Sequence, residues 1–86
     1  MTEKTWHVAE EFNDAAHKKL GNVLRQLGFK IDKKWNASAG SQDIGHWEVS
    51  SPEGRLVIES ETYIGLNVTG KSSLVNKVKK AYSLKP

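Results

Sequence analysis

The sequence predicts an α+β domain, a two-layer sandwich in which two helices cover one face of a three- or four-stranded antiparallel sheet. Apolar residues recur at helical spacing towards both ends of the chain, whereas between residues 29 and 69 they alternate with polar residues, as in half-buried strands. The expected order of elements is α-β-β-β-(β)-α. Because only one face of such a sheet is apolar, both helices are expected on that face.

We expect a single domain spanning residues 1–86, because 86 residues leave too little chain for a second core. The sequence has no cysteine, which excludes disulfides, thiol catalysis and thiolate metal sites. The N-terminal residues lack the apolar segment of a signal peptide, and no apolar run is long enough to span a bilayer. A cytoplasmic protein is therefore expected.

The first helix is expected over residues 15–27, with Gly28 as its C-terminal stop. Its apolar stripe consists of Ala16, Leu20, Val23, Leu24 and Leu27. Polar residues, including His17 and Arg25, fall on the opposite side. Gly21 lies inside the helix, where it costs up to ~1 kcal/mol relative to alanine, and this suggests close packing or a slight bend.

The residues before this helix, 5–13, allow two interpretations. Residues 5–8 have the composition of a short strand, in which case Asp14 caps a helix that begins at Ala15. Alternatively, the helical spacing of apolar residues extends back to Val8, and the helix starts there. The sequence leaves this choice open.

Residues 29–36 alternate between apolar and polar and are expected to form a half-buried strand. Its apolar side is made of Phe29, Ile31 and Trp35. Lys33 falls on the same side and is the one misfit. Residues 37–43 are small, polar and unpatterned, so they are expected to form the main flexible loop.

Residues 44–50 and 55–60 are expected to form a β-hairpin, because both segments are rich in β-branched and aromatic residues and residues 51–54 have turn chemistry. With a four-residue turn, apolar residues face each other: Trp47 with Ile58, and Val49 with Leu56. A three-residue loop would instead place Trp47 opposite Glu59. Burial of apolar surface favours the four-residue turn.

The other face of this hairpin is the favoured binding surface. It carries His46, Glu48, Val57, Glu59 and Glu61, and Tyr63 follows shortly after. Acidic side chains around an exposed apolar residue suit a basic protein partner. We therefore expect a small non-catalytic module that acts through protein–protein interaction, as an adaptor, regulator or inhibitor. Trp6 is a further aromatic residue that serves either as an interface anchor or as packing against the core.

After Thr62 the alternation resumes, either as a fourth strand or as the continuation of a long bent third one. Residues 65–72 match the phosphate-binding pattern G-x-x-x-x-G-K-[ST]. A nucleotide site of this kind needs a later strand with a magnesium-binding aspartate, and only fourteen residues remain after Ser72. We therefore interpret the match as coincidental and expect no cofactor, although Lys71 and the start of the last helix suit a lone anion.

The last helix is expected to begin at Ser72 or Ser73 as its N-cap. Its apolar stripe consists of Leu74, Val75, Val78, Ala81 and Tyr82. Lysines occupy its polar side, as they do in the first helix. The two helices would form one positive layer if they lay side by side.

This positive layer supports the alternative function, nucleic-acid binding. Its residues are Lys18, Lys19, Arg25, Lys71, Lys77, Lys79 and Lys80. The order of elements also resembles that of a double-stranded-RNA-binding domain, whose last helix begins with paired lysines after a turn that contains glycine. Here the corresponding positions hold Ser73, Leu74 and Val75. A protein partner remains favoured.

Catalytic and metal-binding residues are not expected. The three histidines, His7, His17 and His46, are scattered and form no ligand pair of helical spacing. His46 lies opposite Glu59 in the preferred register, but such a pair performs acid–base catalysis only within a closed, water-poor pocket. The protein is therefore not expected to be an enzyme.

Overall fold

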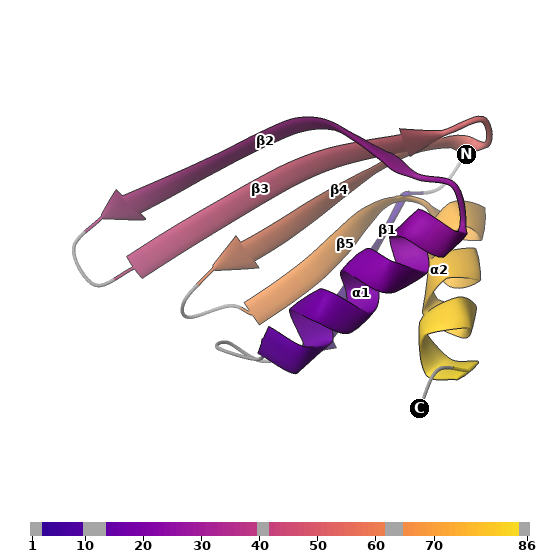
Figure 1. Cartoon of the computed structure of the whole chain (residues 1–86), viewed down its shortest axis with the longest axis horizontal. Helices are drawn as coiled ribbons and strands as arrows, with labels where there is room; N and C mark the ends of the chain where they lie inside the picture. Colours follow the sequence, from indigo (N-terminus) through magenta and orange to yellow (C-terminus); the bar gives the residue numbers. More distant parts are fainter. Residues whose placement is uncertain (1–2, 10–13, 40–41, 62–64, 85–86) are drawn as a thin grey trace.

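The computed structural model describes residues 3–9, 14–39, 42–61 and 65–84 (Figure 1). In chain order the elements are β1 (Glu3–Ala9), α1 (Asp14–Gln26), β2 (Lys30–Ala39), β3 (Gln42–Ser51), β4 (Gly54–Glu61), β5 (Gly65–Lys71) and α2 (Ser72–Leu84). The strands form one antiparallel sheet in the order β1-β5-β4-β3-β2. The predicted α+β class is confirmed.

The predicted number of strands and the order of elements were wrong in detail, because the sheet has five strands and the chain begins with β1. The ambiguous N-terminal segment is a strand over Glu3–Ala9, and residues 10–13 lie outside the described part of the chain. The segment after the hairpin is a separate strand, β5. Gly65 starts it with φ of 97°, a conformation that favours glycine. These two strands remove the similarity in element order to a double-stranded-RNA-binding domain.

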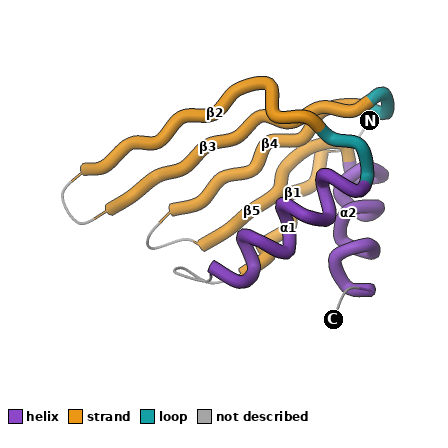
Figure 2. Tube along the Cα trace, viewed as in Figure 1, coloured by secondary structure: helices purple, strands orange, loops and turns teal. Residues whose placement is uncertain are grey.

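Both helices pack on the same face of the sheet, as predicted (Figure 2). Side chains from α1 and α2 form one core with side chains from β3, β4 and β5. Its buried members include Leu20, Val23, Val75 and Val78 from the helices and Val49, Leu56, Ile58, Leu66 and Val68 from the strands. α2 lies over β1, β5 and β4, and α1 lies beside it.

The C-terminal end of α1 forms the expected glycine stop. Gly28 has φ of 88°, its N–H donates to the carbonyl of Arg25, and the N–H of Phe29 donates to the carbonyl of Leu24. This is the Schellman arrangement, which satisfies carbonyls that the helix leaves unpaired. Gly21 was expected to mark either close packing or a slight bend, and a Cβ atom built there would have no neighbour within 4 Å. Packing therefore does not explain this glycine.

The register of the β3–β4 hairpin is confirmed, with Trp47 paired to Ile58 and Val49 paired to Leu56. Ile58 and Leu56 are buried, whereas Trp47 is half-buried and packs against the edge of the core. The Trp47 ring lies over Gly45, where an added Cβ would come within 2.6 Å of the ring. Any side chain at position 45 would therefore force the Trp47 ring to shift.

Strand β2 differs from the prediction because its register shifts between Ile31 and Lys33. Ile31 pairs with Val49, whereas Lys33 pairs with Glu48 and Trp35 with His46, so Asp32 is the extra residue of a β-bulge. The bulge reverses the facing of the residues that follow. Trp35, expected in the core, therefore lies on the face away from the helices and is 43% exposed. The same shift explains why Lys33 seemed misplaced.

Residues 37–43 were predicted to form a loop, but most of this segment is paired. Ser38 pairs with Asp43 and Ala39 with Gln42, so β2 and β3 form a second hairpin; residues 40–41 lie outside the described part. The Ser38 hydroxyl donates to the Asp43 carboxylate at 2.7 Å. This hairpin reaches beyond the region that the helices cover (Figure 1).

Candidate functional site

The face of the sheet away from the helices carries a row of side chains that crosses all five strands. In register, the row consists of Trp35 on β2, His46 on β3, Glu59 on β4, Asn67 on β5 and His7 on β1. At the β1 edge, Nδ1 of His7 lies 3.0 Å from Oδ1 of Asn67. The row is therefore mainly polar, and two of its members contact each other at the β1 edge.

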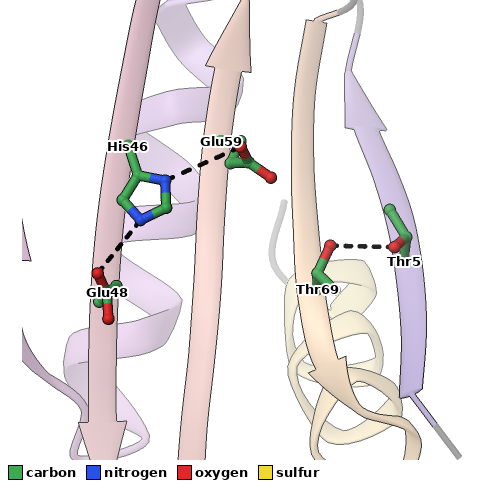
Figure 3. A network of polar contacts seen from close by, with 5 residues as sticks. All are labelled: Thr5, His46, Glu48, Glu59 and Thr69. Carbon is green, nitrogen blue, oxygen red and sulfur yellow. Dashed lines mark hydrogen bonds and ion pairs between the residues drawn. The ribbon is translucent and has the colours of Figure 1, made fainter.

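His46 lies on β3, between Trp35 on β2 and Glu59 on β4. Figure 3 shows its contacts with Glu48 and Glu59. Its Nε2 lies 3.3 Å from Oε2 of Glu48, and its Nδ1 lies 3.8 Å from Oε2 of Glu59. The Trp35 ring stacks on its imidazole. The imidazole is thus held between an aromatic ring and two carboxylates, and only 20% of its side chain is exposed.

The neighbouring row on the same face includes Glu48, paired with Val57, and the pair Thr5 and Thr69. The two threonine hydroxyls lie 3.0 Å apart (Figure 3). All five predicted binding residues therefore share the open face: His46, Glu48, Val57, Glu59 and Glu61. Tyr63 lies outside the described residues. Their common placement follows from the confirmed hairpin register.

Trp35 is the surface residue that the sequence analysis missed. Regular alternation placed it in the core with Ile31, and only the bulge at Asp32 moves it to the open face. One signal was present in the sequence, because Lys33 did not fit the apolar side of a regular strand. A bulge resolves that conflict. We call the surface formed by Trp35, His46, Glu48, Val57 and Glu59 the aromatic–acidic patch.

The aromatic–acidic patch has two carboxylates, Glu48 and Glu59, and both flank His46. Two cations lie on the same face beside it: Lys33 pairs across the strands with Glu48, and Arg55 lies two residues before Val57 on β4. The side chains of Glu48 and Glu59 are 34% and 46% exposed. Such an arrangement offers a stacking surface and carboxylate acceptors to a partner. The His46–Glu59 pair lies on an open surface rather than in a closed pocket.

Within the described residues, no group of three or more histidine, aspartate or glutamate side chains is arranged to hold a metal ion. In the same part of the chain, neither helix is long and apolar enough to cross a membrane. The remaining residues predicted for binding lie on the two helices and at the end of β5.

The lysines of the alternative site lie on α1, α2 and the last residue of β5. Two of them have partners: Lys19 lies 4.3 Å from the centre of the Tyr82 ring, and Lys77 forms an ion pair with Glu53. The Lys19–Tyr82 contact joins α1 to α2, so the two helices are neighbours. The other basic residues are exposed: Lys18, Arg25, Lys71, Lys79 and Lys80.

The segment that matches the phosphate-binding pattern does not form a loop. Gly65–Lys71 is strand β5, paired with β1 on one side and with β4 on the other. A phosphate-binding loop must instead direct successive backbone N–H groups towards one point. Because β5 is a central strand, its backbone is engaged in the sheet.

Trp6 packs rather than projecting into solvent. It is half-buried on β1, and its ring meets the Tyr82 ring of α2 edge to face, with centroids 5.3 Å apart. This contact fastens β1, an edge strand, to the helical layer. Trp6 therefore belongs to the core side of the molecule.

The fold and this site define an α+β domain with one sheet face covered by helices and the other open. A scan against protein-family models, a search of curated proteins and a search of solved structures each found no match.

Proposed function

We propose that this protein is a non-catalytic binding module that recognises a basic protein segment through the aromatic–acidic patch. The observation that supports this most directly is the stacked Trp35–His46 pair beside Glu48 and Glu59 on the open face. Partly exposed tryptophan is enriched among interface hot spots, and Trp35 is such a residue on the edge strand β2.

The chemistry of the patch defines the partner. A lysine or arginine side chain can lie against an indole ring and donate to a nearby carboxylate. Glu48 and Glu59 supply such acceptors on either side of His46. Val57 adds apolar surface next to Glu48. The expected partner therefore presents a basic residue next to an apolar one.

The test is capture of partners from the native host by the immobilised full chain, with the bound protein and nucleic acid both identified. The charge-reversed variant Glu48→Lys with Glu59→Lys should reduce retention of the bound protein at least about tenfold. Trp35→Ala should do the same by removing the stacking surface. All variants must first show cooperative melting.

The matched control reverses three exposed cations on the helices: Lys18→Glu, Lys79→Glu and Lys80→Glu. Lys77 is left unchanged because its reversal would place two glutamates together. Protein retention should persist in this control. If instead the chain retains nucleic acid, with an affinity that falls steeply with salt and is lost in the lysine variant, the alternative nucleic-acid function replaces this one.

A further inference from the structure

An apolar groove lies on the helix-covered side, between α1 and the β2–β3 half of the sheet. Its volume is about 440 Å³, within the range of small-molecule sites. The apolar side chains that line it are Leu20, Leu24, Phe29, Ile31, Trp47, Val49, Ile58 and Leu66. It exists because α2 covers β1, β5 and β4, which leaves the β2 side of this face without a helix.

The groove has polar groups mainly along its α1 wall. His17, Gly21 and Arg25 recur at every fourth residue of α1 and all line it, although the sequence placed both polar residues on the solvent side. The Nε2 of His17 lies 3.2 Å from the Ser60 hydroxyl, and its ring meets the Trp47 ring at 6.0 Å. Arg25 is exposed and forms no ion pair among the described residues.

Gly21, midway between His17 and Arg25, provides an independent indication. Glycine in the middle of a helix is destabilising, and no neighbouring atom requires it at this position. Because Gly21 has no side chain, the α1 wall of the groove is open at this position. Ile31 on the opposite wall is 64% exposed, an unusual degree for an apolar residue that faces the core side of a sheet. Both features suit a groove that receives an apolar molecule.

We infer that the groove binds a small apolar carboxylic acid, with its hydrocarbon on the apolar floor and its carboxylate at Arg25. Charge supports this class of ligand, because the lining contains one arginine, one histidine and no acidic residue. Lys34, which pairs with Trp47 on the same face, adds a second cation nearby. Arginine binds carboxylates through paired hydrogen bonds.

The volume of the groove, about 440 Å³, lies within the range of sites that hold one small molecule, such as a single hydrocarbon chain or an aromatic ring system.

The test uses decanoate as the probe, titrated into the full chain below its micelle concentration and followed by calorimetry and tryptophan fluorescence. Binding should be saturable, with decanol weaker by at least about tenfold and decyltrimethylammonium not bound. Arg25→Gln should weaken the binding of decanoate by a similar factor and leave the affinity for decanol unchanged. Lys80→Gln removes one exposed cation elsewhere and should change the affinity for neither compound.

Two further variants test the location. Gly21→Leu fills the groove from α1, and Ile31→Glu adds an acidic residue to the opposite wall; each should abolish decanoate binding. Ile31 is too exposed for its replacement to unfold the protein, so this variant is informative even if Gly21→Leu is unstable.

Three results would overturn the inference. Equal affinity for decanol and decanoate would exclude recognition of the carboxylate. Unchanged affinity in a folded Gly21→Leu or Ile31→Glu variant would place the ligand elsewhere. A dimer in solution that Ile31→Glu dissociates would show that a second copy of the chain covers the groove.

Discussion

The indole ring of Trp35 stacks on the imidazole of His46, with 5.3 Å between the ring centroids and 15° between the planes. The two residues are directly paired on neighbouring strands, β2 and β3. This pairing depends on the bulge at Asp32, because without an extra residue Trp35 would share the face of Ile31. One irregularity in β2 therefore creates the stacked aromatic pair of the open face.

The two tryptophans of the β2–β3 hairpin should differ in their effect on stability. Trp47→Ala should lower the free energy of unfolding by about 2–4 kcal/mol, less than for a fully buried tryptophan because Trp47 is half-buried. Trp35→Ala should cost about 1 kcal/mol or less, the scale of one aromatic contact. Urea denaturation of both variants measures this difference. Similar losses from both would mean that Trp35 is packed in the core.

Two glycines should respond in opposite directions to replacement by alanine. Gly21→Ala should stabilise the protein by about 0.5–1 kcal/mol, because the added methyl group meets no neighbour and alanine favours the helix. Gly70→Ala should destabilise it by about 1–3 kcal/mol, since the new Cβ would lie 3.0 Å from the Arg55 carbonyl oxygen and 2.6 Å from Leu56. Thermal melting of the pair checks this. A stabilised Gly70→Ala variant would contradict the close approach of β4 and β5.

Hydrogen exchange should distinguish β5 from a phosphate-binding loop. The amides of Leu66 and Val68 should be among the slowest to exchange, because β5 is a buried strand with neighbours on both sides. Amides of the edge strand β2 should exchange faster on average. Magnesium–ATP should change neither the exchange rates nor the melting temperature. Fast exchange across 65–71 with protection by ATP would restore the nucleotide interpretation.

The sequence by itself determined the α+β class, the two helices and the pairing of Trp47 with Ile58. These features follow from local rules, because the spacing of apolar residues fixes which side of each element is buried. Most of the open face was predicted for the same reason. Once Val49 and Ile58 face the helices, Glu48 and Glu59 must face away from them.

Other features depended on contacts between distant parts of the chain. Residues 3–9 form a strand because their backbone pairs with β5 and because the Trp6 ring packs against Tyr82 of α2. Residues 65–71 resemble a phosphate-binding loop locally, but lie as a strand between β1 and β4. A bulge leaves little trace in one strand's sequence, since it is defined by the register of its partner. The groove, likewise, arises from where α1 and α2 rest on the sheet, and no single segment encodes that placement.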